Sequence, residues 1–307
     1  MTSAPILVTG AGGFVCSEVA LALHRAGRDV VAVDQTFDAA TLVRLKGITL
    51  VEGALADTLS GLGPCTSVIH GAAITASPER LGITRAAHIR RNMDLLTATL
   101  DFARGAGASR FLFISSMGVF EPDDAPTPNG RFTEVTEPTA TCTYCAAKHA
   151  GELLTRSAAE EGFATLSLRL GNIFGPHEAV RETRQNLCLV SRMLAEARDS
   201  GVITAQTPDA MREWSWLPDL AVAIAGLLDA PWDTPMIHAG TPPVIGDLAL
   251  ARAIADRVPG TTIRLANPPH AAIRPPMASD HASVFDHVQW TDMEAALDIM
   301  MPLEAVE

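Results

Sequence analysis

The feature that most constrains this sequence is a glycine-rich turn directly after its first apolar run. Residues 5–9 predict a buried strand, and residues 13–26 predict a helix that starts at the turn Gly10-Ala11-Gly12-Gly13. The next apolar run, residues 29–34, ends in Asp34. A strand, a glycine turn, a helix and a strand that ends in an acid together indicate a βαβ unit of an open parallel sheet.

This unit predicts a dinucleotide site. Glycines allow a tight turn, so that backbone N–H groups can approach a pyrophosphate at the helix N-terminus. A carboxylate at Asp34 can accept both hydroxyls of an adenosine ribose, and it would repel a 2′-phosphate. We therefore expect NAD rather than NADP as the cofactor.

The alternation of short apolar runs and amphipathic stretches continues to about residue 170. Further strands are predicted at 48–52, 67–70, 110–115 and 165–170, and helices at 39–45, 83–106, 143–161, 182–198, 217–229 and 247–257. Strands that alternate with helices indicate an α/β fold, a Rossmann-type doubly wound parallel sheet. We predict a dinucleotide-binding domain at 1–175 and a smaller, irregular, mainly substrate-binding part at 176–307, of which about 205–240 returns to the sheet.

Composition argues against several classes of partner. The 307 residues have a net charge of −12 and a pI of about 5.2, whereas nucleic acid and anionic membranes call for a basic face. No apolar run approaches the roughly 20 residues of a membrane span. The N-terminus lacks the basic start and apolar core of a signal peptide. We expect a cytoplasmic protein with no nucleic-acid or membrane partner.

The five cysteines are odd in number and scattered, which fits a reducing compartment. Cys142 and Cys145 have the Cys-x-x-Cys spacing of redox motifs, but no second pair is present to complete a zinc site. We interpret these two as small residues that flank a functional side chain, and we expect no metal.

That side chain is Tyr144, the single tyrosine of the chain, with Lys148 four positions later. Side chains four apart share one face of a helix. A phenol has an ordinary pKa near 10, and a nearby ammonium favours the phenolate and lowers that pKa. Such a pair can move a proton on or off a hydroxyl. The spacing alone also fits a packing aromatic beside a surface lysine.

Together with three further stretches, these motifs resemble the extended short-chain dehydrogenase/reductases, the NAD-dependent epimerase/dehydratase family. Thr9-Gly10-x-x-Gly13-x-x-Cys16 is similar to the family's Thr-Gly-x-x-Gly-x-x-Gly, with a small thiol in place of the third glycine. The resemblance covers most of residues 4–175 and, more loosely, the remainder. The other matching stretches are Val68-Ile69-His70-Gly71-Ala72-Ala73, Ser115-Ser116-Met117-Gly118-Val119-Phe120 and Leu168-Arg169-Leu170-Gly171-Asn172-Ile173-Phe174-Gly175-Pro176.

The resemblance implies the roles of the site residues. Ser116 would hydrogen-bond the substrate oxygen, Tyr144 would act as general acid or base, and Lys148 would hold the nicotinamide ribose. Hydride would pass between a substrate carbon and the nicotinamide. The implied cofactor-binding residues are Gly10, Gly12, Gly13, Phe14, Val15, Asp34, Leu55, Gly71, Ala72, Ala73, Asn92, Ser115, Tyr144 and Lys148.

The residues after the serine bear on the reaction. Family members that remove water carry an Asp-Glu pair there, and this chain has Met117-Gly118, so 4,6-dehydration is not expected. His177 could supply a second acid/base group for a reductive epimerase, or it is a solvated loop histidine. Simple dehydrogenation, or 4-epimerisation by oxidation and re-reduction, needs only the serine, the tyrosine and the lysine.

Several positions resemble family residues that contact substrate phosphate. Arg212 and Arg274 would meet phosphate, but a guanidinium also suits the carboxylate of a sugar acid, and each arginine could instead form a structural ion pair. Residues 202–208 contain no aromatic side chain to stack on a base. The predicted substrate-binding residues are Ser116, Met117, Asn172, Asn186, Leu187, Arg212 and Arg274.

The leading hypothesis is an NAD-dependent oxidoreductase acting at a hydroxyl or carbonyl carbon of a sugar or sugar-derived acid. The alternative enzyme is a nucleotide-sugar 4-epimerase with tightly bound NAD. A non-catalytic NAD-binding sensor is the alternative from another class, and the Ser/Tyr/Lys set argues against it. By analogy with the family, we expect a homodimer formed through the helices at 83–106 and 143–161.

Overall fold

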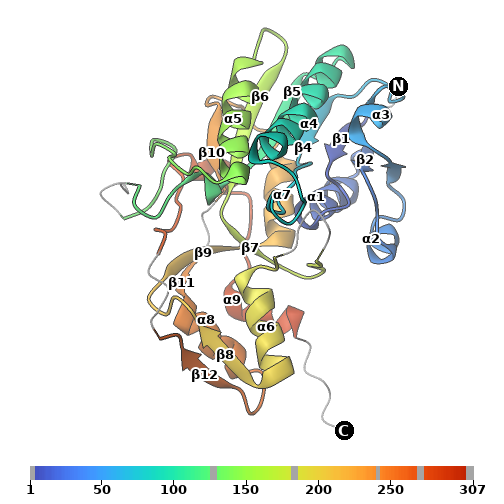
Figure 1. The fold of residues 1–307 in the computed structure, drawn as a ribbon. Helices are drawn as coiled ribbons and strands as arrows, with labels where there is room; N and C mark the ends of the chain where they lie inside the picture. Colours follow the sequence, from blue (N-terminus) through green and yellow to red (C-terminus); the bar gives the residue numbers. More distant parts are fainter. Residues whose placement is uncertain (1–3, 125–129, 181–185, 240–242, 268–272, 302–307) are drawn as a thin grey trace.

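The computed structural model describes residues 4–124, 130–180, 186–239, 243–267 and 273–301. A large sheet lies between helices in one part of the molecule, and a smaller α/β part adjoins the carboxyl ends of its strands (Figure 1). The strands of the large sheet run parallel in the order β10-β6-β5-β4-β1-β2-β3. They are β1 (Ile6–Thr9), β2 (Val30–Asp34), β3 (Thr49–Glu52), β4 (Ser67–His70), β5 (Arg110–Ser116), β6 (Ala164–Leu170) and β10 (Met236–His238).

This strand order confirms the predicted doubly wound α/β fold. The direction of winding reverses between β1 and β4, and a crevice forms at such a switch point beyond the carboxyl ends of the strands. The glycine turn after β1 and the segment after β4 therefore meet at one place. Gly71 N–H donates to the carbonyl of Thr9 at 3.1 Å, which ties the two segments together.

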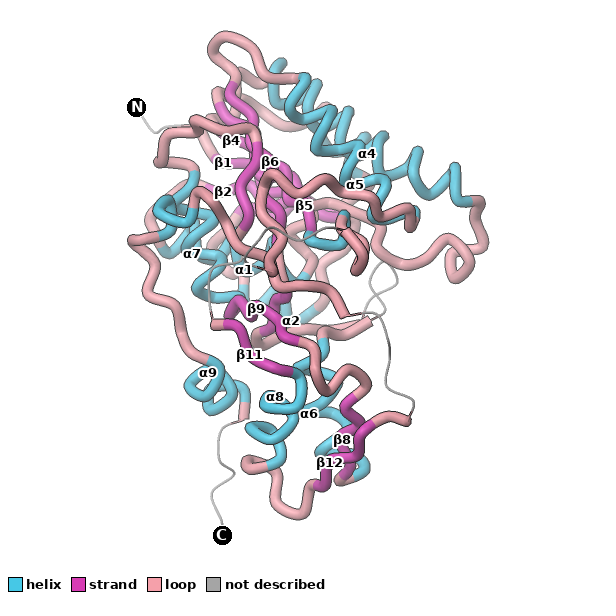
Figure 2. The backbone as a smooth tube through the Cα atoms, turned by 90° about the vertical axis from the view of Figure 1, so that its left-hand side faces the viewer, coloured by secondary structure: helices cyan, strands magenta, loops and turns pink. Residues whose placement is uncertain are grey.

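Helices cover both faces of the sheet, because successive strand residues point to opposite sides. Val8 of β1 belongs to the core beneath α1 and α7, whereas Leu7 belongs to the core beneath α3 and α4. The helices α4 and α5 pack side by side (Figure 2). The helices of this part are α1 (Phe14–Arg25), α2 (Ala39–Arg44), α3 (Leu55–Leu59), α4 (Arg85–Gly105), α5 (Thr143–Ser157) and α7 (Leu217–Leu227), with the 3-10 turn η1 (Met117–Val119).

The smaller part has its own core around two tryptophans. Phe174 contacts Trp214 and Trp216, with ring centroids 5.9 and 5.3 Å apart, and all three are buried. The smaller part contains two small sheets, β11-β9-β7 and β12-β8, and its helices pack against them. The elements are β7 (Asn172–Phe174), α6 (Leu189–Ser200), β8 (Val202–Ala205), β9 (Met211–Trp216), β11 (Val244–Gly246), α8 (Asp247–Ala255), β12 (Thr262–Leu265), η2 (Ala282–Phe285) and α9 (Met293–Met300).

Two predicted helix boundaries are wrong. The helix expected from residue 182 begins at Leu189, because the sulfur of Cys188 caps it by accepting the N–H of Ser191; residues 181–185 lie outside the described part of the chain. The helix expected to reach residue 161 ends at Ser157, where Glu160 and Phe163 pair through their backbones.

The second half of the chain contributes elements to both parts of the molecule. The strand β10 joins the large sheet beside β6, and α7 packs against α1. The division of the chain into two domains stays a prediction. Within the described residues, no helix is long and apolar enough to cross a membrane.

A buried histidine makes the sheet sensitive to acid. His70 is 1% exposed, its Nδ1 is hydrogen-bonded to Thr9 Oγ1 at 2.9 Å, and burial lowers its pKa from 6.5 to about 3. Below pH 6.5 the unfolded chain therefore binds a proton that the folded chain rejects, so stability falls from pH 6.5 toward 3.

We expect His70→Asn to flatten this dependence. Urea unfolding between pH 7 and 4 should show a smaller loss of unfolding free energy in the variant than in the unchanged protein. His24→Asn, at an exposed position of α1, is the control and should keep the original slope. Equal slopes for the His70 variant and the control would contradict the assignment.

Candidate active site

A cavity of about 920 Å³ lies at the switch point of the large sheet. It extends from the glycine turn and α1, past the ends of β4 and β5, to β7 and the segment before α6. It therefore joins the predicted dinucleotide site to the smaller part of the molecule. Of the predicted site residues, it is lined by Gly10, Gly12, Gly13, Phe14, Val15, Asp34, Leu55, Gly71, Ala72, Ala73, Ser115, Ser116, Tyr144, Lys148, Asn172 and Asn186.

The glycine turn fits a dinucleotide. Gly10 has a φ of +73°, and a Cβ on it would lie 2.6 Å from the backbone nitrogen of Ala72, so only glycine lets the turn rest on the segment after β4. The carboxylate of Asp34 accepts the N–H of Gly12 at 2.8 Å and that of Gln35 at 2.6 Å. These contacts fix the acid beside the turn, where a carboxylate can accept ribose hydroxyls.

The structure explains why a cysteine is tolerated in place of the third glycine. A Cβ added to Gly71 would lie 2.2 Å from Cys16 Sγ, so the thiol occupies space that glycine at position 71 leaves free. Burial raises the pKa of Cys16 to about 12, and the group is a neutral thiol at physiological pH. A cysteine at position 16 therefore fits only because residue 71 is a glycine.

The lysine of the predicted catalytic set is almost completely buried. Lys148 is 5% exposed, its Nζ donates to the carbonyl of Ile114 at 2.6 Å, and it lies 4.7 Å from the ring centroid of Phe113 and 5.8 Å from that of Tyr144. Burial lowers its pKa to about 8, and the charge of the nearby Glu152 opposes that shift. The ammonium form therefore persists at neutral pH beside the phenol.

The serine and the tyrosine approach each other at Gly118. Ser116 Oγ accepts the N–H of Gly118 at 3.0 Å. A Cβ placed on Gly118 would lie 3.2 Å from Ser116 Oγ and 3.9 Å from Tyr144 Cε1. The two hydroxyl-bearing side chains thus reach the cavity from β5 and α5, as the sequence predicts.

A buried ion pair anchors the helix that carries the tyrosine and the lysine. Glu152 and Arg169, each 4% exposed, form two hydrogen bonds of 2.7 and 2.8 Å, and the hydroxyl of Ser115 donates to Glu152 at 2.5 Å. These contacts join α5 to β5 and β6. Because removing one partner would leave a buried charge, the register of α5 on the sheet is strongly fixed.

Asn92 lies in α4 and does not line the main cavity. Its Oδ1 accepts the N–H of Ile74 at 2.9 Å, and its Nδ2 donates to the carbonyls of Ile74 and His88. It borders a small hollow beside Tyr144 and Lys148. The amide thus holds the segment after β4 in place, and a direct contact with the cofactor stays a prediction.

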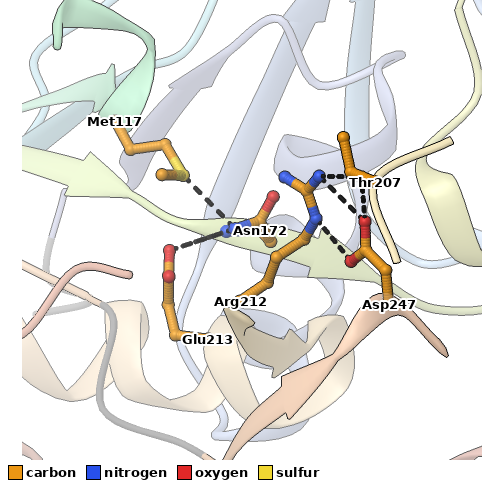
Figure 3. A network of polar contacts seen from close by, with 6 residues as sticks. All are labelled: Met117, Asn172, Thr207, Arg212, Glu213 and Asp247. Atoms are coloured by element: carbon orange, nitrogen blue, oxygen red, sulfur yellow. Dashed lines mark hydrogen bonds and ion pairs between the residues drawn. The ribbon is translucent and has the colours of Figure 1, made fainter. Parts of the chain in front are cut away.

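On the substrate side, Glu213 determines how Asn172 is oriented. Nδ2 of Asn172 donates to Glu213 Oε1 at 3.2 Å and to Met117 Sδ at 3.4 Å (Figure 3). Glu213 is fully buried, and its other oxygen accepts the N–H of Met277 at 3.0 Å. Because Nδ2 is engaged by two acceptors, the amide oxygen is the atom that Asn172 offers to a ligand, and a ligand hydroxyl can donate to it.

The neighbouring arginine points the other way, as alternation along β9 requires. Arg212 donates to both oxygens of Asp247, at 2.7 and 3.0 Å, and to Thr207 Oγ1 at 3.2 Å (Figure 3). Asp247 is 1% exposed. The guanidinium is therefore held by a buried carboxylate instead of lining the cavity.

The remaining predicted substrate residues lie away from the cavity lining. Met117 is buried behind Asn172, and Leu187 is half-buried before α6. Arg274 lies 4.0 Å from Glu121. Substrate contacts by Met117, Leu187, Arg212 and Arg274 stay predictions.

Several cavity residues were not predicted from the sequence. Thr75 and Arg80 follow β4, and Arg44 lies at the end of α2 beside Glu18. A signal for Thr75 was its position shortly after the predicted fourth strand, at residues 67–70. The two arginines add positive charge to the cavity lining of an acidic protein, as an anionic ligand requires.

His177 also lines the cavity and has a φ of 67°. Burial lowers its pKa, and the charge of Arg44 adds to that shift. Its electrostatic neighbours are thus Arg44 and Glu18 of the α1–α2 side rather than the serine or the tyrosine. This placement weakens the interpretation of His177 as a second acid/base group. Over the described residues, no cluster of three or more His, Cys, Asp or Glu side chains could hold a metal ion.

The interpretation of the Cys-x-x-Cys pair as two separate small residues is wrong. Cys142 and Cys145 form a disulfide, with their Cα atoms 5.1 Å apart, across the first turn of α5. The Cys-x-x-Cys spacing was a signal for this bond, but the odd number of cysteines favoured free thiols. Cys16, Cys65 and Cys188 are free thiols.

The position of the serine, the tyrosine and the lysine beside a dinucleotide cavity defines the class of protein: an NAD-dependent oxidoreductase. Residues 6–237 match the model of the NAD dependent epimerase/dehydratase family, and the chain belongs to that family. The predicted resemblance, the enzyme class and the cofactor are confirmed by this match.

Among similar proteins, a UDP-glucose 4-epimerase of Streptomyces lividans is 27% identical over 237 residues, which are 72% of this chain and 70% of the relative. A UDP-glucuronate 4-epimerase of Arabidopsis thaliana is 26% identical over 73% of this chain and 55% of its own length. A solved UDP-glucose 4-epimerase of Stenotrophomonas maltophila, with bound NAD and formylated UDP-arabinopyranose, shares the fold with a TM-score of 0.81. It is 21% identical and covers 98% of this chain and 97% of its own.

Because Tyr144 is the single tyrosine, ultraviolet absorption of its phenolate reports on this group alone. We expect Lys148→Met to raise the midpoint of that titration, since the ammonium stabilises the phenolate. The same variant should lower turnover about 100-fold, the usual contribution of general acid/base catalysis. Tyr144→Phe should show no titration, and an unchanged midpoint in the lysine variant would contradict the pairing.

A second prediction concerns Glu213. We expect Glu213→Gln to raise the substrate KM about 5- to 10-fold, because a misoriented Asn172 loses roughly one hydrogen bond to the ligand. The kcat and the affinity for NAD should change less than about twofold. Combining it with Asn172→Asp, which restores an acceptor on the cavity side, should recover part of the loss. Equal losses in kcat and in NAD affinity would indicate general damage instead.

Proposed function

We propose that this enzyme interconverts the 4-epimers of a nucleotide sugar, by oxidising a ring hydroxyl and reducing the resulting ketone from the opposite face. The observation that carries the proposal is the acid/base set at the cavity, Ser116, Tyr144 and Lys148. An oxidation and its reversal need one group that takes up and returns the same proton. The residues after the serine, Met117 and Gly118, carry no acid or base for a dehydration.

The residues divide the work as follows. The hydroxyl of Ser116 orients the reacting oxygen, and Tyr144 removes its proton as the carbon is oxidised and returns it on reduction. Lys148 stabilises the phenolate with a charge that it retains below pH 8. Bound NAD supplies hydride transfer, and it would be held by the glycine turn, Asp34 and Lys148.

The substrate class is supported by the relatives and by the cavity. The curated relatives are 4-epimerases of UDP-glucose and UDP-glucuronate, and we extend a UDP-sugar substrate to this chain. Asn172 offers an acceptor to a sugar hydroxyl, and Asn186 lines the cavity near the start of α6. Residues 176–307 would supply most of the other contacts with the substrate.

A second candidate is a dehydrogenase of a free sugar or sugar acid that releases NADH. Arg212 is already neutralised by Asp247, which reduces its attraction for a diphosphate. Residues 202–208 also lack an aromatic side chain for a base. Both observations favour a smaller substrate than a nucleotide sugar.

The two reactions are separated by where the reducing equivalents go. Purified enzyme incubated with UDP-glucose, and separately with UDP-glucuronate, should form the 4-epimer by chromatography with no net NADH absorbance. Tyr144→Phe should lower the rate at least about 100-fold. Stoichiometric NADH with a free sugar or sugar acid, and no epimer from either UDP-sugar, would support the dehydrogenase and contradict the epimerase.

We further propose a cytoplasmic homodimer that pairs through α4 and α5. Leu153 and Leu154 of α5 are 59% and 38% exposed, which is consistent with an apolar contact at this helix pair. The proposal rests on these side chains and on analogy with the family.

A further inference from the structure

The disulfide between Cys142 and Cys145 encloses the tyrosine of the catalytic set. Tyr144 lies between the two cysteines in the sequence, so its backbone is part of the covalent ring that the bond closes. Cys142 is the N-cap of α5, and its sulfur accepts the N–H of Cys145 at 3.1 Å. The bond therefore holds the turn of helix from which the phenol projects.

The two sulfur atoms have different access to solvent. Cys142 is exposed, whereas Cys145 is 6% exposed. An exposed cysteine followed by a buried one at a helix N-terminus is the arrangement of reactive Cys-x-x-Cys sites, because the helix end stabilises the outer thiolate. Cys65 has no such environment, since burial raises its pKa to about 11.

The inner sulfur lies beside the same glycine as the catalytic serine and tyrosine. A Cβ placed on Gly118 would lie 3.9 Å from Cys145 Sγ, as well as 3.2 Å from Ser116 Oγ and 3.9 Å from Tyr144 Cε1. Cys145 Sγ, Ser116 Oγ and the Tyr144 ring therefore all border the same small space at Gly118, so a shift of this sulfur bears on the packing around the serine–tyrosine pair.

We propose that Cys142 and Cys145 are a thiol–disulfide exchange site, which takes a dithiol reductant and sets the activity of Tyr144. In the exchange, a thiolate of the reductant attacks the exposed Cys142 Sγ. The Cys142–Cys145 bond breaks, and its electron pair goes to Cys145 Sγ, which takes a proton. The second thiolate of the reductant then displaces Cys142, leaving two protein thiols and the reductant as a disulfide.

The direction of control follows from the geometry. The disulfide restrains the turn that carries Tyr144, and its loss lets Cys142 rotate out toward solvent while Cys145 stays packed against Gly118. A general acid/base held less firmly spends less time in reacting geometry, so the oxidised enzyme is the more active form. In a reducing compartment, which we propose for this protein, disulfides are usually transient and redox-sensing.

The chemical half of the proposal is tested without a sugar substrate. The full-length holoenzyme is equilibrated with oxidised or reduced dithiothreitol, alkylated in its native state, and mapped by mass spectrometry. We expect the Cys142–Cys145 link in the first sample, and alkylation of Cys142 ahead of Cys145 in the second. Free thiols at both positions after oxidation, or a bond that native reduction leaves intact, would overturn the exchange site.

The functional half is read from the phenolate titration of Tyr144 and from turnover. We expect the titration midpoint to differ between the oxidised and reduced enzymes, and kcat for the UDP-sugar to fall at least about threefold on reduction with a smaller change in KM. Cys142→Ser keeps an oxygen at the N-cap and cannot form the bond, so it should match the reduced enzyme under both conditions. Cys65→Ala, a core thiol away from the cavity, should keep the full redox response.

This inference rests on the proposed function for its turnover measurement alone. If no UDP-sugar reacts, the alkylation pattern and the titration still decide the redox site, while the failure counts against the proposed substrate. Identical Tyr144 titrations in both redox states would overturn control of the tyrosine, whatever the substrate proves to be.

Discussion

The burial of one ammonium group organises the active site. Lys148 loses nearly all its contact with water, and this desolvation is offset by the carbonyl of Ile114 and by the faces of Phe113 and Tyr144. The remaining imbalance is what lowers its pKa to about 8. A charge that is poorly hydrated acts strongly on its neighbours, and the phenol of Tyr144 is one of them.

The other groups around Lys148 do little to neutralise its ammonium, so that its charge acts on Tyr144. Cys16 and His70 are held neutral by burial, so neither competes for the charge at neutral pH. The negative charge of Glu152 is largely neutralised by Arg169, which donates two hydrogen bonds to its carboxylate. The same ion pair fixes the helix α5 on the sheet. Placement and charge of the catalytic pair thus depend on one small set of buried contacts.

Local patterns in the sequence were sufficient for much of the fold. Apolar periodicity predicted β4 at its observed bounds and α5 at its observed start, because this signal lies within the element itself. The strands β7 and β11 have three residues each, too few to show a period. Their pairing with β9 is decided by tertiary contacts that no local pattern records.

The site shows the same division between local and distant information. The cofactor residues of the glycine turn were predictable because they form a continuous motif. Arg212 meets Asp247 35 positions away, and Glu213 meets Asn172 41 positions away, so these pairings became visible only in three dimensions. Successive residues of β9 point to opposite sides, so Arg212 pairs with Asp247 while Glu213 is buried against Asn172.

The central claim is that a ring hydroxyl is oxidised and re-reduced by way of the phenol and the dinucleotide. The most direct measurement is the fate of deuterium at C4 of the UDP-sugar during epimerisation in ordinary water. The account predicts that the product retains the deuterium at C4 and that turnover is slowed by a primary isotope effect. Exchange of that deuterium with solvent would contradict it, because the hydrogen would then have left as a proton.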